Sequence, residues 1–73
     1  MTMSYRVEID REEDGRWLAE VVELAGVMVY GSSADDALAK VQALALRVIA
    51  DRIEHGECPS GPVSVSFEPS VAA

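Results

Sequence analysis

The stretch Ser33–Gly56, SADDALAKVQALALRVIADRIEHG, predicts one long amphipathic helix around which the rest of the chain is arranged. Ser33 suits the N-cap because its hydroxyl can accept a hydrogen bond from a first-turn N–H, and Asp36 is placed to complete a capping box. Gly56 can adopt the left-handed conformation that ends a helix. Apolar residues recur at about 100° per residue and share one face, namely Ala37, Leu38, Val41, Leu44, Ala45, Val48 and Ile49.

Four segments outside this helix predict β-strands, because each is rich in β-branched or aromatic residues. They are Ser4–Asp10, Arg16–Val22, Val27–Tyr30 and Val63–Phe67. Asp14-Gly15 lies between the first two and supplies the turn of a hairpin. The chain after Phe67 contains a proline and small residues, so we expect it to fray.

The resulting order is β-β-β-α-β, which predicts an α+β fold in one domain, residues 1–73, with an ordered core of about residues 4–68. We expect a four-stranded mixed sheet of order 3-2-1-4, because a right-handed crossover can return the last strand beside the first. The helix should then cover one face of all the strands, including the apolar side of Val63–Phe67.

The net charge of −7 argues against nucleic acid or an anionic membrane as a partner and favours a basic protein. A single cysteine, Cys58, cannot form an internal disulfide. The chain has no apolar run near the length of about 20 residues that spans a membrane, and its start has no signal-peptide pattern. We therefore expect a cytoplasmic protein.

Four short motifs follow one another over nearly the whole chain. They are Tyr5-x-Val7-x-Ile9, Asp14-Gly15-x-Trp17-x-Ala19-x-Val21, Leu24-x-Gly26 and Gly31-x-Ser33-x-Asp35-Asp36-Ala37. In this order and spacing the chain resembles the HicB-type antitoxin domain. The resemblance implies a partial ribonuclease-H-like fold that binds a small basic HicA-like toxin. Such toxins cleave messenger RNA, and the antitoxin blocks their active surface.

The chain also departs from the family pattern. Val22 and Ala25 stand where the family usually has prolines, so the following turn has less covalent restraint. Many family members carry a DNA-binding segment after this domain. Here the sequence ends soon after the fourth strand, so we do not expect operator binding.

The acidic residues around the first turn are the candidate contacts for a basic partner: Glu12, Glu13, Asp14, Glu20 and Glu23. Their role would be electrostatic steering, with inhibition by steric occlusion. The alternative is that the charged turn is simply solvated. Leu46 and Ile53 lie outside the main helical stripe, which indicates a homo-oligomer (a dimer or tetramer) or another partner. The alternative is that they are isolated apolar residues on the surface. An oligomerisation domain without a toxin is therefore a further possibility.

A vestigial metal-dependent nuclease is the alternative from another class. Glu8, Asp10 and Glu20 could share a sheet face and hold Mg²⁺. Such an enzyme would also need carboxylates from the helix and the last strand, where Ser64 and Ser66 offer none. In a chain this acidic, a solvated carboxylate face is the simpler interpretation, so we expect no enzyme, metal or cofactor.

Overall fold

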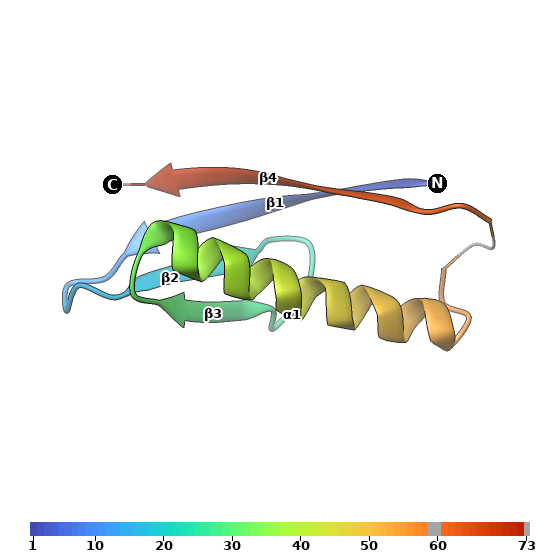
Figure 1. Cartoon of the computed structure of the whole chain (residues 1–73), viewed down its shortest axis with the longest axis horizontal. Coiled ribbons are helices and arrows are strands. Elements are labelled where there is room, and N and C mark those ends of the chain that lie inside the picture. Colours follow the sequence, from blue (N-terminus) through green and yellow to red (C-terminus); the bar gives the residue numbers. More distant parts are fainter. Residues whose placement is uncertain (59–60, 73) are drawn as a thin grey trace.

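The structure, a computed structural model, describes residues 1–58 and 61–72 and contains four strands and one helix (Figure 1). The predicted order β-β-β-α-β is confirmed. The elements are β1 (Thr2–Arg11), β2 (Trp17–Val21), β3 (Met28–Gly31), α1 (Ala34–Glu54) and β4 (Ser64–Ala72).

The four strands form one mixed sheet of order β3-β2-β1-β4, as the sequence predicts. β1 pairs antiparallel with β2, and β2 pairs antiparallel with β3. After α1 the chain returns to the other edge, where β4 runs parallel to β1. Figure 1 shows β1 and β4 extending well past β2 and β3, so one end of the sheet is only two strands wide.

The core lies between α1 and one face of the sheet. Val7 pairs with Val21 and Ile9 with Ala19, so these side chains point to the same face. α1 places a buried residue against them at every fourth position. No buried side-chain polar atom in the described residues lacks a hydrogen-bond partner. The buried apolar residues are Met3, Val7, Ile9, Ala19, Val21, Leu24, Val27, Ala37, Val41, Ala45 and Ile49.

Both predicted ends of α1 are present. The Ser33 hydroxyl accepts a hydrogen bond from the Asp36 N–H at 3.0 Å. The Asp36 carboxylate accepts a hydrogen bond from the N–H of Ser32, one residue earlier than the Ser33 N–H that a capping box uses. At the other end Gly56 has φ +73°, and the N–H of Glu57 bonds to the carbonyl of Arg52 at 2.9 Å. This is a Schellman motif, in which the left-handed glycine satisfies the last carbonyls of the helix.

The position of α1 over the sheet differs from the prediction. The helix packs on β2, β3 and part of β1, and it hardly reaches β4. Val65 and Phe67 are therefore only half-buried, and Val71 is 54% exposed. The reason is width, because a helix about 10 Å across covers roughly two strands spaced ~4.8 Å apart. The expectation that the helix covers the whole apolar side of the last strand is wrong.

The last strand is also longer than predicted, since β4 continues through Pro69 to Ala72 instead of fraying. The Ser64 N–H donates to the Met1 carbonyl at 2.8 Å, which sets the backbone groups of even-numbered residues toward β1. The nitrogen of Pro69 therefore faces the open edge, and the proline removes no bond from the ladder.

Glu57–Pro62 contains two prolines, which is typical of a loop, and its positions 59 and 60 lie outside the described residues. Within the described residues, no helix combines the length and the apolar character that crossing a membrane requires.

Candidate protein-binding surface

The face of the sheet opposite α1, called the outer face below, carries both acidic and apolar side chains. Strand register and alternation place on it Arg6, Glu8 and Asp10 from β1, Leu18 and Glu20 from β2, Met28 and Tyr30 from β3, and Ser66 and Glu68 from β4. No helix covers this face in the part of the chain that the structure describes.

Two carboxylates stand directly opposite one another at the middle of the outer face. Glu8 on β1 pairs in register with Glu20 on β2, and Asp10 follows on the same face. None of the three forms an ion pair with another described residue. Like charges directly opposite on neighbouring strands destabilise a sheet, so this arrangement favours an external cation.

Exposed apolar side chains lie beside these carboxylates. Met28 pairs with Glu20, and Tyr30 pairs with Leu18. Met28 is 47% exposed and Tyr30 is 46% exposed. The guanidinium of Arg16 lies 4.1 Å from the centre of the Tyr30 ring, a cation–π contact. Methionine and tyrosine are enriched at protein interfaces, so the composition of this region fits a protein partner.

The turn between β1 and β2 holds three of the predicted contact residues. Asp14 accepts the backbone N–H of Arg16 and forms a 2.7 Å ion pair with its guanidinium. The hydrogen bond from the Arg16 N–H is the main cause that lowers the pKa of Asp14 below its ordinary value. Glu12 and Glu13 have no ion pair among the described residues. Gly15 has φ +89°, as the predicted turn requires.

Glu23 lies at the opposite end of β2 and is bound within the chain. Its carboxylate accepts the backbone N–H of Arg6 at 2.9 Å and the Arg6 Nε at 3.0 Å. The backbone hydrogen bond is the first cause of the lowered pKa of Glu23. This residue therefore ties the β2–β3 turn to β1.

The five predicted contact residues do not form one patch. Glu12, Glu13 and Asp14 lie at one end of β2, and Glu23 lies at the other. Glu20 sits between them, where its nearest acidic neighbours are Glu8 and Asp10. Sequence reasoning missed Met28 and Tyr30. Their alternation within a short strand was the signal that they share a face.

This geometry does not provide the set of metal ligands that the nuclease hypothesis requires. Glu8, Asp10 and Glu20 share a face, but the described residues contain no group of three or more His, Cys, Asp or Glu side chains placed to hold a metal ion. The expectation that the last strand offers no carboxylate there is wrong, because β4 extends to Glu68. That residue pairs in register with Arg6.

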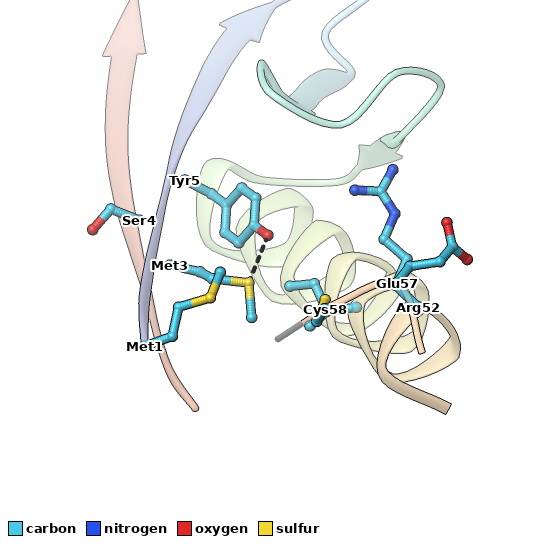
Figure 2. Close-up of a pocket in the computed structure, with 8 residues that line it drawn as sticks. Met1, Met3, Ser4, Tyr5, Arg52, Glu57 and Cys58 are labelled. Atoms are coloured by element: carbon cyan, nitrogen blue, oxygen red, sulfur yellow. Dashed lines mark hydrogen bonds between the residues drawn. The ribbon is translucent and has the colours of Figure 1, made fainter. Parts of the chain in front are cut away.

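A separate hollow of about 380 Å³ lies between the start of the chain and the end of α1. Figure 2 shows Met1, Met3 and Tyr5 across this hollow from Cys58 and Arg52. The Tyr5 hydroxyl donates to the sulfur of Met3 at 3.2 Å. No two titratable side chains among its described lining residues are hydrogen-bonded to each other.

Comparison of the chain with models of known protein families, with curated proteins and with solved structures finds no match in any of the three. The resemblance to HicB-type antitoxins therefore rests on the sequence motifs and stays a prediction.

Proposed function

We propose that the chain is an antitoxin-type protein-binding module, similar to HicB, that sequesters a small basic HicA-like toxin. One observation carries the proposal. The outer face sets Glu8 opposite Glu20, with Asp10 nearby and no internal cation paired to them among the described residues, directly beside the exposed Met28 and Tyr30.

The energetics of this face favour an external basic partner. Opposed like charges cost roughly 0.2–1 kcal/mol in an isolated sheet, and a lysine or arginine placed between them removes that cost. The neighbouring apolar side chains contribute about 25 cal/mol for each Å² that the complex removes from water. The charges thus determine which partner binds, and the burial of apolar surface contributes to the affinity.

The acidic turn between β1 and β2 extends the negative electrostatic potential of the outer face at one end of the sheet. Glu12 and Glu13 are free of ion pairs within the described residues, so their charge is available to attract a basic protein. Asp14 and Glu23 keep their charge while holding the two turns in shape. Inhibition needs no chemistry from this chain, because occupying the toxin's active surface excludes messenger RNA.

The test uses the full chain and the small basic protein encoded by the adjacent reading frame, which the resemblance leads us to expect. We expect the two to co-purify and the chain to suppress cleavage of messenger RNA. The double variant E8K/E20K should weaken binding by about tenfold or more, because it turns the centre of the outer face repulsive. E12K/E13K should mainly slow association and flatten its dependence on salt.

The control is D51K/E57K, which makes the same charge change around the end of α1, away from the outer face. It should bind nearly as the unmodified chain does. Equal affinities for E8K/E20K and the control would overturn the outer face as the binding surface. Failure of the two proteins to associate at all would overturn the antitoxin assignment.

A further inference from the structure

α1 carries a second apolar stripe that its own sheet does not use. Its residues follow one another at spacings of four, three, four and three, the pattern of the a and d positions of two heptads. All are exposed, with Leu46 at 47% and Ile53 at 44%. This stripe, called the seam below, consists of Ala39, Ala43, Leu46, Ala50 and Ile53.

The contacts of α1 show which way the seam points. Ala37 lies against Gly31 of β3, and Ile49 lines the hollow with Met3 on β1. These two helix positions are about 120° apart around the axis at ~100° per residue. Measured around the helix axis from Ala37 through Ile49, Ile53 lies ~40° beyond Ile49 and Leu46 lies ~60° beyond it. The seam therefore points outward and leans toward the β4 side of the molecule.

The sheet is bare on that same side. The helix-facing side chains of β4 are only half-buried or exposed, with Val71 at 54%. One helix covers about two strands, so a four-stranded sheet leaves room for a second covering element. The seam and this bare strip therefore lie on the same side of the molecule.

Charge identifies the occupant. The seam carries no charged residue, and neither does the helix-facing side of β4, where Val65, Phe67, Pro69 and Val71 stand. A chain with net charge −7 repels its own copy at the acidic outer face, whereas the seam and the helix-facing side of β4 place no carboxylates against each other. A basic partner has no electrostatic reason to choose it.

The charges that flank the seam also fit a second copy. Lys40 and Glu54 lie on the same edge of the seam, seven residues on either side of Arg47. When two such helices run antiparallel, Lys40 of one approaches Glu54 of the other, and this happens twice about a two-fold axis. The two copies of Arg47 face one another at the axis, so two attractive pairs stand against one repulsive pair. The three alanines allow the helix axes to approach to about 8 Å.

We propose that the chain forms a two-fold homodimer in which α1 pairs antiparallel with α1 of a second copy through the seam, and that this dimer shields the bare strip of β4. The assembly goes beyond the antitoxin function. It leaves the outer face of each copy open, so a dimer can present two partner-binding surfaces. With only two heptads in the seam, we expect a dissociation constant in the micromolar range.

Sedimentation of the full chain over a range of concentrations up to about 100 μM tests the proposal. Leu46→Glu should raise the dimer dissociation constant at least about tenfold, because it places a carboxylate in the middle of the seam. Met28→Glu is the matched control, since Met28 is exposed to the same 47% but lies on the outer face. It should leave the dissociation constant unchanged.

Ala50→Glu provides a second seam variant, and circular dichroism shows whether each variant keeps its fold. A folded Leu46→Glu or Ala50→Glu chain that still dimerises like the unmodified chain would overturn the proposal. So would an unmodified chain that stays monomeric at the highest concentration, or a dimer that Met28→Glu breaks and the seam variants do not. None of these outcomes bears on toxin binding, which E8K/E20K tests separately.

Discussion

Two parts of one sheet face differ sharply in burial although their sequences look alike. Ile9 on β1 and Val71 on β4 are neighbours in register and point to the same face. Ile9 is 1% exposed and Val71 is 54% exposed. Both strands alternate apolar and polar residues, so the pattern alone does not separate them. The difference comes from the position of the single helix, which lies over β2, β3 and part of β1.

The covered and the bare parts of this sheet face have different roles. The covered part, where α1 meets β2, β3 and part of β1, holds most of the buried apolar residues and therefore most of the stability. The bare strip of β4 contributes little burial and remains open for association. A small chain with one helix in its described residues cannot cover both parts at once.

The largest expected effect compares these two neighbours directly. Ile9→Ala should lower the free energy of unfolding by about 3–5 kcal/mol, because it leaves a cavity in a fully covered core. Val71→Ala should lower it by less than about 1 kcal/mol, because much of its surface is already in water. Urea denaturation of both variants, at a concentration where the chain is monomeric, measures the two values.

Repeating the Val71→Ala measurement at high protein concentration sharpens the comparison. If Val71→Ala lowers the free energy of unfolding more at high protein concentration than under monomeric conditions, a second copy covers the bare strip. Equal losses for Ile9→Ala and Val71→Ala under monomeric conditions would contradict the division between covered and bare parts.

The next effect concerns why α1 lies where it does. At Gly31 on β3, an added Cβ would come within 2.7 Å of the Ala37 Cα and 2.9 Å of its Cβ. Gly31→Ala should therefore push the helix off β3 and cost about 2–3 kcal/mol. The control is Gly15→Ala, where φ is +89° but the added Cβ meets nothing within 4 Å. It should cost only about 1 kcal/mol of backbone strain.

Thermal unfolding of the two glycine variants separates close packing from backbone strain. If Gly31→Ala were no more destabilising than Gly15→Ala, close packing at β3 would not be what positions the helix.

Most of the fold follows from local sequence signals. The capping residues Ser33 and Gly56, the turn glycine Gly15 and the alternation in each strand act within a few residues, and all are present as predicted. The extension of β4 was not predictable in this way. It depends on which edge the nitrogen of Pro69 faces, and that is fixed only when Ser64 pairs with β1.

The candidate surface was less predictable because it is assembled across strands. The pair formed by Glu8 and Glu20 exists only in the β1–β2 register. The bonds between Glu23 and Arg6 join residues 17 positions apart, so sequence alone did not show that Glu23 is held internally. Charge and composition indicated a basic protein partner, but they did not indicate which carboxylates share a face.

The smallest effect concerns the tie between the covered strand β3 and the start of α1. Asp36 accepts the N–H of Ser32, which is the main cause of its lowered pKa, and it also pairs with Lys40 at 3.0 Å. A carboxyl group whose pKa is lower in the folded chain stabilises the fold above its unfolded pKa of about 3.9. That contribution falls away as the pH drops through the folded pKa.

Asp36→Asn should therefore lower the melting temperature slightly at pH 7 and by less at pH 3, because the carboxyl group becomes protonated as the pH falls through its lowered folded pKa. Asp35→Asn removes the same charge from the same helical turn without touching Ser32, and its effect at pH 7 should be smaller. If the difference between the unmodified chain and Asp36→Asn were the same at both pH values, the carboxylate would not be what fastens the helix to β3. The position of α1 would then depend on its packing against the sheet.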